Sequence, residues 1–211
     1  MKKRIVAGNW KMNKNYNGAM QLLDELLAQF NPALGVEVIV APPAVYLSEF
    51  SNRVSGSDNF FLAAQDVSAN NNGAYTGEIS AEMLASLHFK YCIIGHSERR
   101  EYHNESDTLI NLKLKALIEQ SILPILCVGE TLDEREANAQ EQVVAKQIEM
   151  AVEGVTTKQL KNMVIAYEPV WAIGTGKTAS SEQAEEMHAF IHQLLLNKFG
   201  EEIASSISII Y

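Results

Sequence analysis

The chain has 211 residues, of which 47% are hydrophobic and 20% are charged, and this composition suits one globular domain with a large core. Its formal net charge of −9 argues against a nucleic-acid partner, and no apolar run is long enough to span a membrane. Its N-terminus does not have the pattern of a signal peptide, so we expect a cytoplasmic protein. Cys92 and Cys127 lie in apolar runs and are expected to be buried free thiols in a reducing compartment.

Short β-branched runs alternate with longer segments of helical period along the whole chain. The runs predict strands at residues 4–7, 36–41, 60–64, 91–94, 122–128, 163–167 and 207–211. Because these runs are apolar nearly throughout, we expect the strands to be buried on both faces, as in a parallel sheet covered by helices.

Apolar residues repeat at helical spacing between the predicted strands, within residues 22–30, 143–152 and 184–195. Each of these stripes predicts a helix with one side packed on the sheet. Ser180 followed by Gln183 is the pattern of a capping box, and it predicts where the third helix begins.

Strands that alternate with helices fit either a doubly wound open sheet or a (β/α)8 barrel. No Gly-x-Gly-x-x-Gly pattern follows the first predicted strand, which disfavours a dinucleotide-binding open sheet. The polar candidates Asn9, Lys11, His96 and Glu168 follow the carboxyl ends of different strands, where a barrel gathers its catalytic groups. We therefore expect one barrel domain over residues 1–211.

Residues 166–179 place an acid, Glu168, at the end of an apolar run, directly before Pro169 and a glycine-rich tip. Proline fixes its own φ angle and restricts the preceding residue, so Glu168 should be held in an extended conformation. Gly174 and Gly176 would let the backbone approach a ligand closely. The pattern is typical of a catalytic carboxylate followed by a lid, although a glycine-rich surface loop explains this segment alone equally well.

Two weaker signals do not predict a site. Gly-Thr-Gly-Lys-Thr resembles the end of a nucleotide-binding P-loop, but Trp171 occupies the position of the first required glycine. His188 and His192 have the spacing of a zinc-protease pair, but Ala189 stands where that motif has its glutamate. We therefore expect no metal site.

Five motifs in order carry a resemblance to the triosephosphate isomerase family, at residues 8–13, 73–78, 94–100, 127–130 and 166–179. The chain resembles this family from residue 5 to residue 211. The resemblance implies an α/β fold of the TIM-barrel type, with about seven β/α units in this sequence. It also implies interconversion of dihydroxyacetone phosphate and D-glyceraldehyde 3-phosphate through an enediolate, in glycolysis and gluconeogenesis, without a cofactor or a metal.

The resemblance assigns the base to Glu168 and the electrophile to His96. A dry pocket would raise the proton affinity of a carboxylate toward what carbon deprotonation needs. The residues after His96 are expected to form a short helix, whose N-terminal field disfavours a protonated imidazole. The alternatives are a strand-end acid in a surface ion pair and a core histidine, and the sequence does not say which ring nitrogen of His96 carries the proton.

The resemblance further implies that Lys11 supplies positive charge near the substrate carbonyl and phosphate, and that Asn9 hydrogen-bonds the substrate. Glu98 would orient Lys11, and the backbone N–H of Gly174 would bind the phosphate. A lysine two residues past a strand is, by itself, more often a solvated surface charge. Further residues expected to support the site and its lid are Ser97, Pro169, Trp171, Ile173, Thr175 and Tyr211, with lid hinges at residues 169–171 and 177–179.

The Asn72-Gly73 pair predicts a turn. In the family this loop reaches a second subunit, so the resemblance implies a homodimer with Tyr75 and Thr76 near the partner's site. The alternative is an ordinary exposed turn. We also expect Arg99 to form an ion pair with Glu105.

Family members continue beyond the position of Tyr211, with an eighth strand and further helices that hold most of the phosphate grip. We therefore expect a truncated sequence whose first and last strands have unpaired edges, and a chain of low stability and activity as it stands. Two other interpretations stay open: another phosphosugar enzyme on a barrel, and a non-catalytic fragment that retains the motifs.

Overall fold

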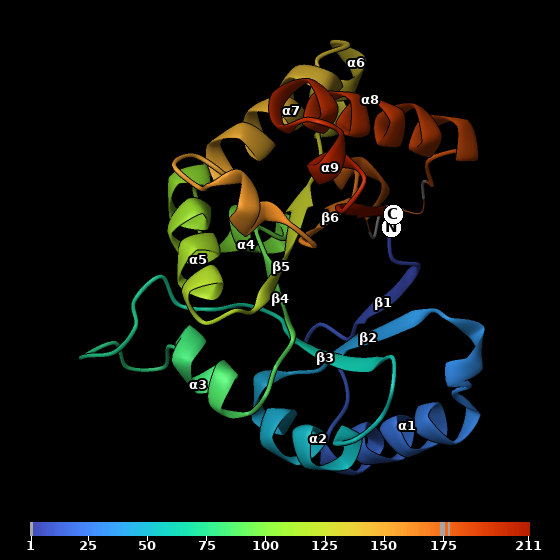
Figure 1. The fold of residues 1–211 in the computed structure, drawn as a ribbon, viewed down its shortest axis with the longest axis vertical. Coiled ribbons are helices and arrows are strands. Elements are labelled where there is room, and N and C mark those ends of the chain that lie inside the picture. Colours follow the sequence, from blue (N-terminus) through green and yellow to red (C-terminus); the bar gives the residue numbers. More distant parts are fainter. Residues whose placement is uncertain (1, 174–175, 177) are drawn as a thin grey trace. The chain divides into compact units, whose positions relative to one another are not determined.

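The computed structural model describes residues 2–173, 176 and 178–211, in which strands and helices alternate along the chain (Figure 1). The chain divides into two compact units. The first unit comprises Lys3–Ile93 and Ala116–Pro124, and the second comprises Ile94–Lys115 and Ile125–Tyr211 together with Lys2. Each unit is described in turn.

The first unit alternates strands with helices from β1 to the start of β4. Its elements are β1 (Ile5–Asn9), α1 (Tyr16–Gln29), β2 (Glu37–Ala41), α2 (Leu47–Val54), β3 (Phe60–Ala64), α3 (Ala81–Ser86) and β4 (Tyr91–Ile94), with single 3-10 turns at Pro32–Leu34 and Ala44–Tyr46. The strands are parallel, with β1 paired to β2, β2 to β3 and β3 to β4. Helices α1 and α2 lie side by side, and α2 packs on β3 (Figure 1).

The second unit continues the alternation with longer helices. Its elements are α4 (Ser97–Tyr102), α5 (Asp107–Glu119, whose last residues belong to the first unit), β5 (Leu123–Val128), α6 (Leu132–Glu136), α7 (Gln140–Ala151), β6 (Val164–Tyr167), α8 (Ser181–Phe199), α9 (Glu201–Ala204) and β7 (Ser208–Ile210), with 3-10 turns at Thr157–Leu160 and Val170–Ala172. Strands β5, β6 and β7 pair in parallel, and α7 packs beside α8. No helix among the described residues is both long and apolar enough to cross a bilayer.

All of the predicted strands are present, with ends that differ by at most two residues. The largest difference is in β1, which extends to Asn9 because its pairing with β2 continues to the Asn9–Ala41 register. Glycine and asparagine are poor strand formers, so the sequence pattern ends before the hydrogen bonds do. The capping box at α8 is confirmed, since the Ser180 hydroxyl accepts the N–H of Gln183 and the Gln183 side chain accepts that of Ser180.

The expectation of burial on both faces is confirmed for β4 and β6 but is wrong for β1. Every residue of β4 and β6 is buried, whereas the middle of β1 is exposed, with Val6 at 62%. Within its unit β1 pairs with β2 alone, so fewer neighbours cover its side chains. Cys92 and Cys127 are buried and form no disulfide among the described residues, as predicted.

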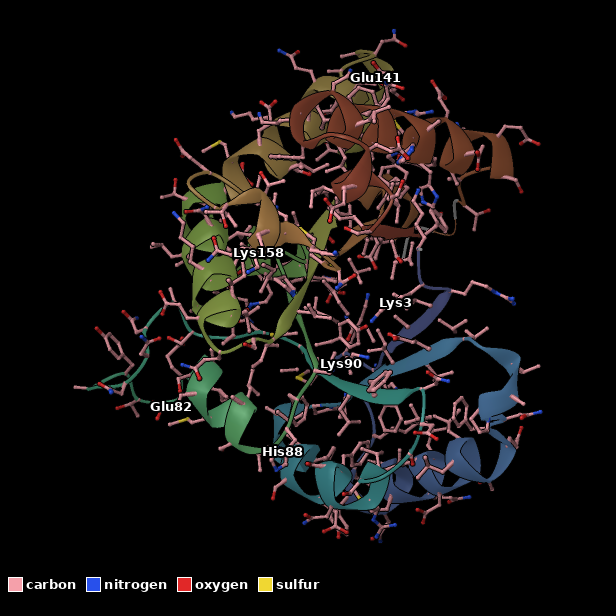
Figure 2. All side chains as sticks on the ribbon, in the orientation of Figure 1. Lys3, Glu82, His88, Lys90, Glu141 and Lys158 are labelled. Carbon is pink, nitrogen blue, oxygen red and sulfur yellow. The ribbon has the colours of Figure 1, made fainter. Side chains whose placement is uncertain are left out.

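An ionic cluster lies at the amino ends of the strands of the first unit. Glu37, the first residue of β2, lies 2.9 Å from the ammonium of Lys3 and 3.2 Å from that of Lys90, and it accepts the hydroxyl of Tyr91 (lysines labelled in Figure 2). Burial raises the pKa of Glu37, but the hydroxyl and the two lysines outweigh burial and hold this pKa below its usual value. The cluster thus compensates the charge of Glu37 at the amino end of β2, whereas Asn9 lies at the carboxyl end of β1.

A second buried carboxylate, Glu105, joins α4 to α5 in the second unit. Its Oε1 accepts the Nε of Arg99 at 2.6 Å and the ammonium of Lys113 at 2.5 Å, and its side chain is 2% exposed. The predicted Arg99–Glu105 ion pair is therefore confirmed, but Lys113 is an additional partner. Burial raises the pKa of Glu105, and the two cations more than reverse this, so the pKa lies below its usual value.

Replacing Glu105 by glutamine should destabilise the protein by about 3–5 kcal/mol, because the two cations would lose the carboxylate charge that they face in a dry site. The measurement is urea unfolding at pH 7. Glu202→Gln is the matched control, since the Glu202–Lys161 ion pair is exposed and its loss should cost less than about 1 kcal/mol. Equal losses in the two variants would contradict the prediction.

The stability contributed by the Glu105 charge should also depend on pH. The folded pKa is depressed, so the unfolded chain takes up a proton first, near pH 4.3, and the contribution is fully present above that pH. It is lost as the pH falls through the folded pKa. The difference in unfolding free energy between the wild type and Glu105→Gln should therefore be constant near neutrality and shrink below about pH 4.

Candidate active site

Two of the predicted catalytic residues meet at the carboxyl ends of strands in the second unit. Glu168 directly follows β6, and His96 follows β4 by two residues. The carboxylate oxygen Oε2 of Glu168 lies 3.4 Å from Nε2 of His96. The imidazole is buried, with 4% of the residue exposed, while the Glu168 side chain keeps 33% of its surface exposed. The imidazole is therefore enclosed by protein, whereas the Glu168 side chain is partly accessible to solvent.

The backbone of α4 sets the protonation of His96. The residue caps α4, and its Nδ1 accepts the backbone N–H of Glu98 at 3.2 Å. An accepting nitrogen carries a lone pair, so the ring is neutral and its proton is on Nε2. The Glu98 carboxylate lies 3.6 Å from the same Nδ1, beyond hydrogen-bond distance, so the backbone N–H determines the tautomer. The Nε2–H donor consequently faces Glu168.

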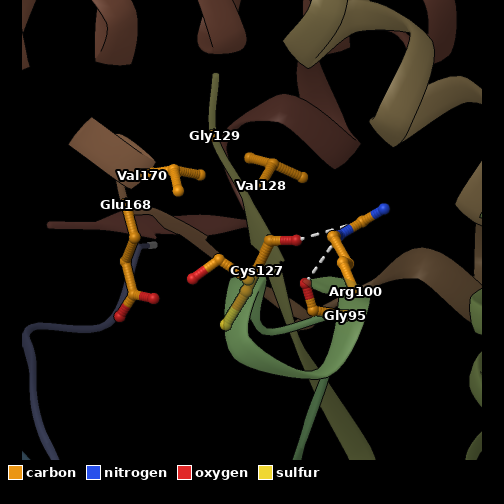
Figure 3. Close-up of a pocket in the computed structure, with 8 residues that line it drawn as sticks. Gly95, Arg100, Cys127, Val128, Gly129, Glu168 and Val170 are labelled. Carbon is orange, nitrogen blue, oxygen red and sulfur yellow. Dashed lines mark hydrogen bonds between the residues drawn. The ribbon is translucent and has the colours of Figure 1, made fainter. Parts of the chain in front are cut away.

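Arg100 ties together the loops around this pair. Its Nε donates to the carbonyl of Gly95 at 2.7 Å, and a second guanidinium nitrogen donates to the carbonyl of Cys127 at 3.5 Å (Figure 3). The third nitrogen pairs with Asp107 at 2.5 Å. The arginine therefore fixes the ends of β4 and β5 to the start of α5. This role was not predicted from the sequence, where Arg100 appeared only as part of a motif.

A small cavity of ≈10 Å³ lies behind Glu168, near the minimum volume that one water molecule needs. Its lining residues, drawn in Figure 3, are Gly95, Ser97, Arg100, Cys127, Val128, Gly129, Glu168 and Val170. Complete burial raises the pKa of the Cys127 thiol well above its usual value, and the negative charge of Glu168 raises it further. The thiol therefore stays protonated and acts as an apolar wall behind the carboxylate.

The segment after Glu168 is held by a second acid, Glu130. This carboxylate is completely buried and accepts the Tyr167 hydroxyl at 3.1 Å and the indole N–H of Trp171 at 2.9 Å. Arg135 lies 3.7 Å from it. Burial and the Glu130 charge both raise the pKa of Tyr167, so its hydroxyl remains a donor. This role of Glu130 was not predicted from the sequence, although an acid two residues after a buried strand could have indicated one.

Two other predicted catalytic residues, Asn9 and Lys11, belong to the first unit. Asn9 ends β1, and its side-chain oxygen accepts the backbone N–H of Lys11 at 2.9 Å. Lys11 has a φ of +51°, a conformation that costs energy in a residue other than glycine. The amide of Gln65 stabilises this turn, since it donates to the carbonyl of Lys11 at 3.0 Å and to that of Ala41 at 2.8 Å. This role of Gln65 was not predicted from the sequence.

The remaining predicted residues are placed as follows. Pro169 caps the 3-10 turn that contains Trp171, and Ile173 follows it. Gly174, Thr175 and Lys177, which include the predicted phosphate-binding N–H and part of a hinge, lie outside the described residues. The ring of Tyr211 lies 6.4 Å from that of Tyr167, Ser97 begins α4, and Tyr75 and Thr76 are exposed.

His188 and His192, the two histidines of α8, each contact another residue of the second unit. His188 packs edge-on to the Tyr167 ring at 6.3 Å, and burial lowers its pKa below the usual value. His192 lies 3.4 Å from the ammonium of Lys2. Among the described residues, no three metal-binding side chains gather in one place.

A carboxylate that faces a neutral imidazole donor, at the carboxyl ends of parallel strands, is typical of α/β-barrel enzymes that transfer protons. Comparison with known sequences identifies which such family this is. The sequence model of the family described as triosephosphate isomerase matches residues 4–211, so the chain belongs to the triosephosphate isomerase family. Its fold class is that of the (β/α)8 barrel, and seven parallel strands are found in the described residues.

Curated relatives carry the same name. Triosephosphate isomerases of Alkaliphilus metalliredigens and Clostridium acetobutylicum are each 47% identical over 211 residues, which is all of this chain and 84% of theirs. The triosephosphate isomerase of Rhodopirellula baltica is 46% identical over 212 residues, again with the whole chain aligned and 83% of the relative covered.

The close approach of Gly129 to Glu168 gives a test of this geometry. A Cβ at Gly129 would lie 2.0 Å from the carbonyl oxygen of Glu168, so Gly129→Ala must push the two segments apart. We expect a loss of stability of about 3 kcal/mol or more and a reduced turnover, measured by thermal unfolding and by initial rates. Gly18→Ala in α1 is the control, since its Cβ would make only ordinary contacts, at 3.4 Å or longer, and alanine favours the helix.

Proposed function

We propose that the chain isomerises dihydroxyacetone phosphate and D-glyceraldehyde 3-phosphate. The observation that carries the proposal is the Glu168–His96 pair, in which a carboxylate lies 3.4 Å from the protonated nitrogen of a neutral imidazole. We infer the identity of the substrate from membership of the triosephosphate isomerase family. The reaction moves hydrogen within one molecule, so it requires neither an oxidant nor a cofactor.

In the proposed mechanism Glu168 removes a proton from the carbon beside the substrate carbonyl. The electron pair of the broken C–H bond forms the C=C bond of an enediolate, and negative charge develops on the carbonyl oxygen. The Nε2–H of His96 donates to that oxygen and can pass its proton to it. His96 then regains a proton from the hydroxyl on the adjacent carbon, and Glu168 returns its proton to the former carbonyl carbon. The C=C electron pair forms that new C–H bond, and the oxygen that lost its proton becomes the new carbonyl oxygen.

The remaining proposed roles concern charge and water. Lys11 stabilises the negative charge of the substrate, and Asn9 holds the turn that presents Lys11. Glu98 lies beside His96 and orients Lys11 in this proposal. In this proposal the segment 169–179 acts as a lid, and the hydrogen bond from Trp171 to Glu130 anchors its first hinge. Closing it over the substrate would exclude water and strengthen every electrostatic contact in the site.

Glu168→Gln should lower kcat for both substrates by about 10²–10⁴-fold, because a carboxamide is no base but keeps the size of the side chain. The measurement is a coupled assay in each direction. Glu141→Gln is the matched control: this exposed acid is on α7 (labelled in Figure 2), and its removal should leave kcat unchanged. Undiminished isomerisation by Glu168→Gln would refute the mechanism.

We also propose that the active form is a homodimer in the cytoplasm. The first unit exposes apolar side chains that a partner surface would cover, and exposed apolar patches of this kind commonly mark interfaces. They are Met12, Tyr16, Val45, Tyr75 and Met83. Tyr75 and Thr76 lie on the loop between β3 and α3, and in this proposal they reach the active site of the second subunit.

Tyr75→Asp should convert the dimer to a monomer, because a charge would be buried in an apolar interface, and activity should fall in parallel. Sedimentation equilibrium measures the assembly state. Leu34→Asp, which changes a still more exposed apolar residue outside that loop, is the control and should remain dimeric. A Tyr75→Asp protein with unchanged mass and activity would exclude this loop from the interface.

A further inference from the structure

The side-chain amide of Gln147 binds both backbone groups of one residue, Gly129. Its Oε1 accepts the N–H of Gly129 at 2.9 Å, and its Nε2 donates to the carbonyl of Gly129 at 3.1 Å. This pair of bonds is the one that a neighbouring strand would make. Gln147 lies among the buried residues Val144, Ile148 and Ala151 of α7, so a polar side chain interrupts the apolar stripe that faces the sheet.

The other side of Gly129 is occupied by the backbone of Glu168. The pairing of β5 with β6 continues past the ends of both strands, with the N–H of Glu168 on the carbonyl of Val128 at 2.9 Å and the N–H of Val170 on that of Glu130 at 2.9 Å. These two bonds flank Gly129, which lies so close to Glu168 that a Cβ would be 2.0 Å from its carbonyl oxygen. Gly129 is thus held between Gln147 and Glu168.

The position of the Glu168 carboxylate depends on this backbone contact. Its Oε2 is buried and makes no hydrogen bond among the described residues, with Nε2 of His96 lying 3.4 Å away. Side-chain contacts therefore do little to fix the carboxylate, and the placement of its main chain decides where it stands. Any shift of Gly129 is passed directly to Glu168, because the two backbones are in contact.

We propose that Gln147 is a positioning residue for the base: its amide clamps Gly129, and Gly129 sets the backbone of Glu168. The inference rests on the proposed function, since it assigns Glu168 the role of base. A purely structural role, in which Gln147 only fastens α7 to the sheet, would lower stability without changing the chemistry. The two roles differ in what they do to kcat.

Gln147→Met keeps the length of the side chain and removes both hydrogen bonds to Gly129. We expect kcat to fall roughly 10- to 100-fold with KM changed by less than about twofold, because a displaced base slows proton transfer but leaves substrate binding intact. Gln142→Met on the exposed side of α7 is the matched control and should match the wild type. Thermal unfolding of each variant verifies that it is folded at the assay temperature. An unchanged kcat in a folded Gln147→Met protein would overturn the proposal.

A double-mutant cycle tests whether Gln147 acts through Glu168. In a Glu168→Ala background the base is gone, so adding Gln147→Met should change the residual rate of deuterium uptake from heavy water by less than about twofold. An equal loss in both backgrounds would show that Gln147 acts elsewhere. If Gln147→Met does not fold, Gln147→Glu takes its place in both experiments. This variant keeps the hydrogen-bond acceptor for the N–H of Gly129 but loses the donor to its carbonyl. An inactive wild type would refute the proposed function itself, which is a different outcome from an active wild type that is insensitive to Gln147.

Discussion

The close approach of two backbones, at Gly129 and Glu168, is the constraint on which the Glu168–His96 pair of the second unit depends. Parallel pairing of β5 and β6 continues beyond both strands, through the bonds from Glu168 to Val128 and from Val170 to Glu130. Only glycine leaves room for this contact. The extension places an acid, which would otherwise begin a loop, on a rigid sheet edge beside His96. Main-chain hydrogen bonds thus place the backbone of Glu168 without any hydrogen bond to its carboxylate among the described residues.

The acidic residues within the fold differ in how their negative charge is compensated. Glu37, Glu105 and Glu130 each accept hydrogen bonds from several donors, and cations hold the pKa values of the first two below the usual range. Glu168 is treated differently, because its buried oxygen lacks a hydrogen bond among the described residues. The contrast distinguishes three acids whose oxygens accept neighbouring donors from Glu168, whose buried oxygen accepts none among the described residues.

The strands, the long helices and the pair His96–Glu168 could be predicted from the sequence, because hydrophobic period and short motifs are local signals. The end of β1 could not be predicted, because its pairing with β2 continues through Gly8 and Asn9 to Ala41, and glycine and asparagine have low strand propensity. The tautomer of His96 depends on a backbone donor two residues away, and the roles of Gln65 and Gln147 depend on main-chain groups 54 and 18 positions distant along the chain. Polar residues that bind the backbone of a distant loop have no periodic signature, so the sequence does not predict them, whereas the short motifs around His96 and Glu168 do indicate that pair.

The wall behind Glu168 has a consequence for the protein's resistance to oxidants. Peroxides attack the thiolate form of cysteine, and burial together with the adjacent carboxylate raises the pKa of Cys127 so that little thiolate forms. The thiol also lines the cavity of ≈10 Å³ beside Glu168, which leaves little room for an added oxygen atom. The negative charge of Glu168 therefore helps to protect the neighbouring thiol from oxidation.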